Sequence, residues 1–204
     1  MPQKLEAVAA GTETQNGRIV FTGTVCEKKG ARQLVQAFAV VKAAIPNATL
    51  CMVGPDWFFA DGKSYIQYLQ QFIPENIKPH IQFVGAVANT EIPEWIASAQ
   101  VCAYPSHMEA MPLAWLEAMA LGKPVVASQT GPGTEIITHE KDGLLCNPHD
   151  PESIAENLIR LLTDNELVKN CGKNARQKVR DDFDMHQLVH QNIAFYEQVA
   201  GKGQ

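Results

Sequence analysis

Short runs of continuous apolar residues alternate along this chain with stretches in which apolar residues recur at helical spacing. The continuous runs predict strands over 18–23, 48–54, 80–87, 101–106, 124–129 and 143–148. The helical spacing predicts helices over 29–45, 65–72, 92–99 and 112–121. Strands that are apolar throughout are typical of parallel strands buried on both faces. The alternation therefore predicts a doubly wound, Rossmann-like α/β domain with a parallel sheet of about six strands.

The two ends of the chain depart from this alternation. After Pro151 the pattern is helical throughout, which predicts a C-terminal helical appendage. The opening stretch 1–17 is polar and contains several Gly and Thr residues, as in a linker or the cut edge of a longer protein. We therefore divide the chain into this edge, 1–17, and one domain with its C-terminal helices, 18–204.

The composition argues against several classes of function. Of the 204 residues, 46% are hydrophobic and 19% are charged, as in soluble globular proteins. The formal net charge of -5 disfavours binding to nucleic acid or to an anionic membrane, because both need a basic face. No apolar run approaches the ~20 residues of a transmembrane segment. We expect a cytoplasmic protein, and leave open whether the full-length protein attaches to the membrane surface.

The cysteines do not indicate a metal site. There are five of them, and no Cys-x-x-Cys pair occurs. Three lie inside apolar strand-like runs, so we expect small buried thiols in a reducing compartment rather than disulfides or metal ligands.

The predicted topology indicates where a ligand would bind. Open α/β sheets bind ligands beyond the carboxyl ends of their strands, where the strand order reverses. With the order 3-2-1-4-5-6, that point lies between the first and fourth strands. The loops 23–30 and 105–113 should therefore form the site.

The first of these loops carries features of a phosphate site. Gly23 permits a tight turn, and Lys28, Lys29 and Gly30 then open a helix. Two cations and free backbone N–H groups at a helix start can hold a phosphate. The alternative is a solvated turn with surface lysines.

The second loop places two carboxylates around the start of a helix. Glu109 precedes the helix, Pro112 suits its first position, and Glu117 lies in its second turn. Carboxylates accept hydrogen bonds from hydroxyl groups, and the helix start offers N–H donors to a phosphate. The alternative is that both glutamates are solvated surface acids. Against this, Glu117 lies in the apolar stretch LAWLEAMAL, where an unpaired carboxylate is costly.

These residues form a pattern that resembles a known family. PSHMEAMPLAWLEAMALGKPVVAS resembles the signature of glycosyltransferase family 4 (group 1), a Glu, seven residues and a second Glu. The resemblance extends from Arg18 through the C-terminal helices. It implies retaining transfer of a sugar from a nucleotide diphosphate donor by an enzyme with two Rossmann-like domains (GT-B). We expect this chain to be the C-terminal, donor-binding half, without the N-terminal acceptor domain; the acceptor could be a glycan, a lipid or a small molecule.

The resemblance also implies roles for individual residues. Glu109 would be the catalytic residue that contacts the sugar, Glu117 would hold the ribose, and Lys29 would hold the diphosphate. Val87 and Asn89 would meet the base. The full set of implied binding residues is Gly23, Thr24, Lys28, Lys29, Gly54, Val87, Asn89, Ser106, Ala110, Met111, Pro112, Leu113 and Glu117. The donor would be linked to UDP or GDP, with no cofactor and no metal.

Two residues of this set depart from the family pattern. Thr24 stands where the family has an arginine, which removes one cation from the diphosphate site, and Ala110 replaces a common glycine. Two other functions stay open, and Thr24 favours the second of them. One is a nucleotide-sugar epimerase of the same architecture, and the other is a non-catalytic module that binds a sugar nucleotide.

Overall fold

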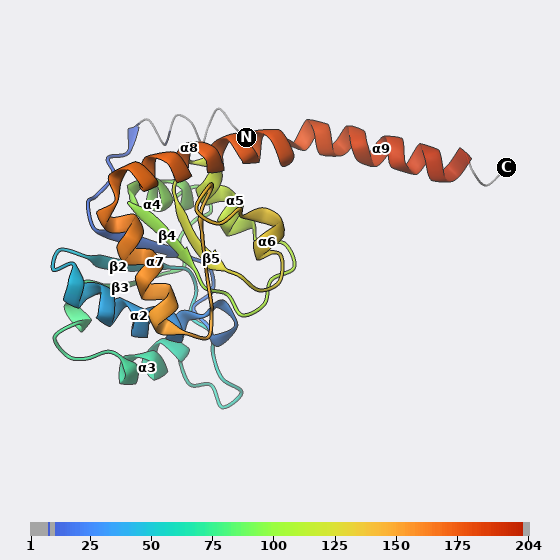
Figure 1. The fold of residues 1–204 in the computed structure, drawn as a ribbon. Coiled ribbons are helices and arrows are strands. Elements are labelled where there is room, and N and C mark those ends of the chain that lie inside the picture. Colours follow the sequence, from blue (N-terminus) through green and yellow to red (C-terminus); the bar gives the residue numbers. More distant parts are fainter. Residues whose placement is uncertain (1–7, 9–10, 202–204) are drawn as a thin grey trace.

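The sheet of this protein has six parallel strands in the order β3-β2-β1-β4-β5-β6. The computed structural model describes residue 8 and residues 11–201 (Figure 1). The strands are β1 (Arg18–Thr22), β2 (Thr49–Val53), β3 (Ile81–Gly85), β4 (Val101–Tyr104), β5 (Val125–Ser128) and β6 (Leu144–Cys146). Each strand lies within its predicted range, so the predicted doubly wound sheet is confirmed. Most of the predicted edge 1–17 and the last three residues lie outside the described part of the chain.

The four helices that the spacing predicts follow the first four strands, and further short helices lie between the elements. They are η1 (Glu27–Lys29), α2 (Ala31–Ala44), α3 (Tyr65–Leu69), η2 (Gln70–Phe72), η3 (Lys78–His80), α4 (Ile92–Ser98), α5 (Leu113–Ala120), α6 (Gly133–Ile136), α7 (Pro151–Thr163), α8 (Asn165–Asp182) and α9 (Met185–Gly201). One predicted position is wrong: Pro112 is the N-cap of α5, with φ -84° and ψ 79°, and Leu113 is the first helical residue. A proline can occupy either place, because neither needs its N–H for the helix.

The core lies on both faces of the sheet. Consecutive residues of β1, β2, β4 and β5 are buried, which requires that helices cover both faces. Helix α2 packs on α7, and α5 packs on α4 and α8. Four cysteines are buried, and burial raises the pKa of Cys102 and Cys146 to about 12, so both remain thiols at neutral pH.

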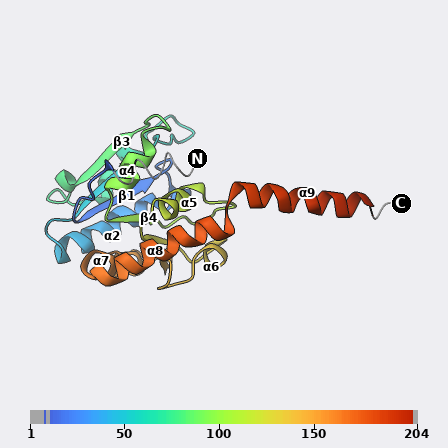
Figure 2. The same ribbon diagram turned by 90° about the horizontal axis from the view of Figure 1, so that it is seen from above.

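The C-terminal helices confirm the predicted appendage and extend beyond the sheet. Helix α8 crosses the body of the domain, and α9 continues away from it (Figures 1 and 2). Large apolar side chains on α9 are exposed, among them Ile193, Phe195 and Tyr196. Within the described residues, no helix combines the length and apolar character needed to cross a membrane.

Candidate functional site

A cavity of about 570 Å³ opens at the carboxyl ends of β1, β2 and β3, and α4 and α5 form its sides. The residues of the implied binding set that line it are Gly23, Thr24, Gly54, Val87, Asn89 and Glu117. Because the loops after parallel strands emerge at one edge of the sheet, residues up to 94 positions apart in the sequence meet here. The cavity lies beside the point where the strand order reverses, but no residue of the predicted loop 105–113 lines it.

Backbone rather than side chains forms part of the cavity wall. Gly54 has φ +148°, and a Cβ atom there would lie 2.1 Å from the carbonyl oxygen of Gly23. The loops after β1 and β2 thus approach as closely as two backbones can, which only glycine allows. Farther along, Val25 and Asp56 form a parallel bridge.

Glu117 faces this cavity from α5 and is half-buried. Among the residues that the structure describes, none donates a hydrogen bond to its carboxylate or forms an ion pair with it. Burial raises the pKa of this carboxyl above its usual value, since water solvates the charge less well. The carboxylate is therefore an acceptor that a ligand in the cavity could satisfy.

Lys29 and Glu109, which the family pattern assigns to different parts of the donor, form an ion pair. The Lys29 Nζ atom donates to Glu109 Oε1 at 2.6 Å, and the Glu109 side chain is 10% exposed. The same two loops are joined by the backbone N–H of His107, which donates to the Lys28 carbonyl at 2.9 Å. The sequence places both charges at one edge of the sheet, but it does not predict that they touch.

A network around Glu27 fixes the first loop. Its carboxylate accepts hydrogen bonds from Arg32 at 2.6 and 3.0 Å and from the Tyr65 hydroxyl at 2.6 Å. The Arg32 guanidinium holds the pKa of this carboxyl at about 2, so the network keeps its charges at physiological pH. Because Lys29 follows two residues later, the network also fixes the backbone from which the Lys29 side chain extends. Nothing in the local sequence pattern indicates it.

The remaining residues of the implied set do not line this cavity. They are Lys28, Lys29, Ser106, Glu109, Ala110, Met111, Pro112 and Leu113. Ser106 is buried, whereas Lys28, Met111 and Leu113 are exposed. The Leu113 N–H donates to the Met111 carbonyl at 3.1 Å, so it is already occupied.

The α4 wall of the cavity is absent from the sequence-based site. Ile92, Pro93 and Ile96 contribute an apolar side to it. The rule that ligands bind at the carboxyl ends of the strands points to the loops after β1 and β4. It does not point to α4, which begins a few residues after β3. Within the described ranges, no three histidine, cysteine, aspartate or glutamate side chains gather as a metal site would require.

The sheet order and the cavity at its carboxyl edge define a Rossmann-like domain of the kind found in GT-B glycosyltransferases. Residues 4–178 match the family model of the glycosyl transferases group 1, and the chain belongs to this family. It is 32% identical over 171 residues to N-acetyl-alpha-D-glucosaminyl L-malate synthase from Bacillus anthracis, covering 84% of this chain and 42% of the relative. The chain spans about half the length of the curated relatives it matches.

Solved structures have the same fold. One is the C-terminal domain of the glycosyl transferase group 1 family protein LpcC from Francisella tularensis, with a TM-score of 0.73 and 25% identity; the match covers 90% of this chain and 93% of that one. Another is HepE from Anabaena in complex with UDP and glucose, with a TM-score of 0.81 and 23% identity, covering 97% and 53% of the two chains.

Proposed function

We propose that this chain is the donor-binding, C-terminal domain of a retaining glycosyltransferase of family 4, which transfers a hexose from a UDP- or GDP-linked donor. The observation that carries the proposal is the Glu117 carboxylate, which has no partner among the described residues and lies on the wall of a cavity at the carboxyl edge of the sheet. A carboxylate accepts hydrogen bonds and donates none, so its natural ligand there is a pair of hydroxyl groups.

The nucleoside would occupy the cavity. Val87 and Asn89 would face the base, and Glu117 would accept hydrogen bonds from the ribose hydroxyls. The volume of about 570 Å³ and the apolar side from α4 suit a planar base, since small-molecule sites are mostly apolar with a few polar groups. HepE, which has the same fold, is known in complex with UDP, and this supports a nucleotide as the ligand.

The diphosphate and sugar would lie toward the Lys29–Glu109 pair. The Lys29 ammonium would bind the diphosphate without a metal, and Glu109 would contact the sugar as the catalytic residue. Thr24 brings a hydroxyl where the family has a guanidinium, so the positive charge at the diphosphate site would come from Lys29 together with the exposed Lys28. The acceptor would bind to a second Rossmann-like domain, and positioning of both reactants accounts for ~7–11 kcal/mol of a typical barrier reduction. We therefore expect this chain alone to transfer no sugar.

Calorimetric titration of the Lys29→Ala variant tests this assignment. The variant should bind UDP or GDP about tenfold or more weakly than the parent chain, because a charge-assisted hydrogen bond contributes ~1.5–3 kcal/mol. Its affinity for the matching nucleoside should be unchanged. EDTA should alter neither value.

The matched control is Lys169→Ala, which removes an exposed cation from α8. It should bind all these ligands like the parent. An equal loss of nucleoside and nucleotide affinity in Lys29→Ala would contradict the assignment, as would binding that disappears with EDTA.

A further inference from the structure

The Glu109 carboxylate has a single partner within the described part of the chain, the Lys29 ammonium. The Glu109 side chain is 10% exposed and that of Lys29 is 30% exposed, so water solvates the carboxylate much less than the ammonium. The Lys29 ammonium is therefore the more accessible member of the pair to an incoming anion. The pair is therefore stable only as long as nothing competes for the ammonium.

A diphosphate that binds at Lys29 is such a competitor. It carries more negative charge than a carboxylate, so it draws the ammonium toward itself and leaves Glu109 with a weaker partner. A nearly buried carboxylate that loses its counter-ion is unfavourable, and repulsion between it and the diphosphate adds to the cost. Thr24, on the same loop as Lys29, brings no positive charge that could offset this.

A sugar attached to the diphosphate changes this balance. Its hydroxyl groups can donate to the Glu109 carboxylate and replace the hydrogen bond that Lys29 withdraws. The carboxylate then has partners in both the empty and the donor-loaded site, but not in a site that holds the nucleoside diphosphate alone.

We propose that Glu109, through its ion pair with Lys29, is the residue that makes the site prefer the sugar-loaded donor over the sugar-free nucleoside diphosphate. This inference rests on the proposed function, and it adds a role for Glu109 in releasing the spent nucleotide. After sugar transfer, the carboxylate loses the hydroxyl donors, and re-formation of its pair with Lys29 favours departure of the nucleoside diphosphate.

The Glu109→Gln variant tests the proposal, because it keeps the size of the side chain and removes its charge. Affinities are measured by calorimetry for UDP, UDP-glucose, UDP-N-acetylglucosamine, GDP and GDP-mannose. In the variant, the nucleoside diphosphate of the preferred base should bind about tenfold more tightly than in the parent. The affinity for the sugar-loaded donor should change much less. In the variant, the donor loses the repulsion between its diphosphate and Glu109, but its sugar also loses the charged acceptor for its hydroxyl groups. The dissociation constant of the nucleoside diphosphate divided by that of the sugar-loaded donor should therefore fall about tenfold.

The control is Glu156→Gln, which removes one negative charge from an exposed position on α7 and should leave the ratio unchanged. Thermal unfolding without ligand checks that both variants fold. An unchanged ratio, or weaker binding of UDP and GDP by Glu109→Gln, would overturn this inference and leave the proposed function standing. If the parent chain binds none of the five compounds, the proposed function fails, and this inference fails with it.

Discussion

At the scale of single residues, Glu117 combines two opposed properties. Its carboxylate lies where a ligand can use it, but burial disfavours its charge and raises its pKa. A carboxyl whose pKa is higher in the folded than in the unfolded state stabilises the fold when protonated. This contribution is fully present below the unfolded-state pKa and is lost as the pH rises through the folded-state pKa. At neutral pH the ionised group therefore lowers stability while the ligand is absent.

The Glu117→Gln variant should separate stability from binding. At pH 7 its thermal midpoint without ligand should exceed that of the parent, and the difference should shrink as the pH falls below the raised pKa. Its affinity for the nucleoside should fall about tenfold, because a charged acceptor is lost. In the parent, the affinity for the nucleoside should decline as the pH falls and Glu117 is protonated. Because the pKa of Glu117 is raised, this decline should begin at a higher pH than it would for a glutamate of ordinary pKa. Thermal unfolding and titration at several pH values measure both effects; a variant that is less stable and binds equally well would refute this role.

At the scale of elements, the site depends on how closely the loops after β1 and β4 approach. Gly30, the N-cap of α2, has φ +70°, and a Cβ atom there would lie 1.9 Å from the Pro105 carbonyl oxygen. Neither the conformation nor the space admits another residue. This contact brings Lys29, on the loop after β1, beside Glu109, on the loop after β4.

Gly30→Ala should therefore destabilise the domain by at least ~3 kcal/mol, since the backbone strain of ~1–2 kcal/mol is joined by a direct clash. Gly62→Ala is the matched control: Gly62 has φ +80°, but open space surrounds its Cβ position. It should cost only the strain of ~1–2 kcal/mol. Urea unfolding measures the loss of unfolding free energy in both variants. Equal losses would show that the contact between the loops is unimportant.

The elements themselves were predictable, whereas the contacts between side chains were not. The continuous apolar runs predict all six strands, because the pattern is local. Strands β1, β2, β4 and β5 are buried on both faces, whereas the edge strand β3 is only partly buried. The start of α5 differs from the predicted start by one residue, since Pro112 fits both the N-cap and the first helical position. The ion pair of Lys29 with Glu109 depends on tertiary geometry, and no spacing in the sequence encodes it.

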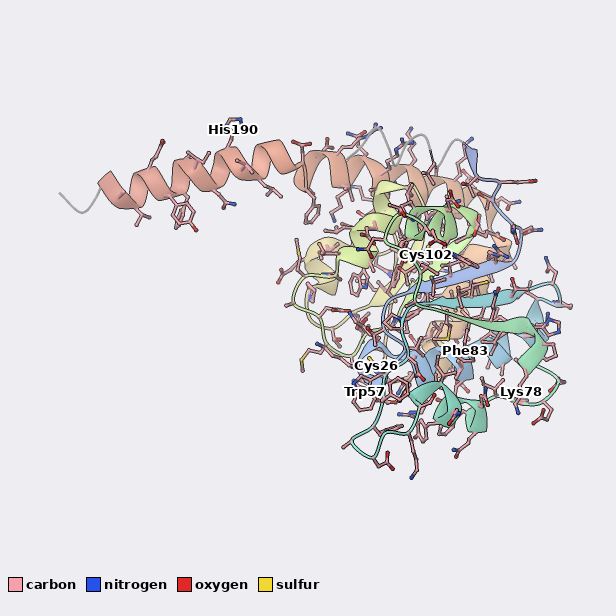
Figure 3. All side chains as sticks on the ribbon, turned by 180° about the vertical axis from the view of Figure 1, so that it is seen from behind. Cys26, Trp57, Lys78, Phe83, Cys102 and His190 are labelled. Carbon is pink, nitrogen blue, oxygen red and sulfur yellow. The ribbon has the colours of Figure 1, made fainter. Side chains whose placement is uncertain are left out.

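At the scale of the whole molecule, the functional features gather at one edge of the sheet. The cavity, the Glu117 carboxylate and the Lys29–Glu109 pair all belong to loops and helices at the carboxyl ends of the strands. The topological rule for open α/β sheets predicts this edge. It does not predict that the apolar side from α4 completes the cavity. Helix α9 takes no part in this edge. Figure 3 shows its labelled residue His190 well away from Cys102 in the sheet.

The central claim is that a nucleotide binds in the cavity at the carboxyl ends of β1, β2 and β3. Amide chemical-shift mapping of the isotope-labelled chain, titrated with UDP and with GDP, tests it most directly. We predict that one of the two shifts the amides of Gly23, Thr24, Gly54, Val87 and Asn89, together with those around Glu117. Saturable shifts confined to another surface, such as the hollow of about 450 Å³ bordered by Ala39, Lys42 and His80, would contradict the claim, as would the absence of any shift.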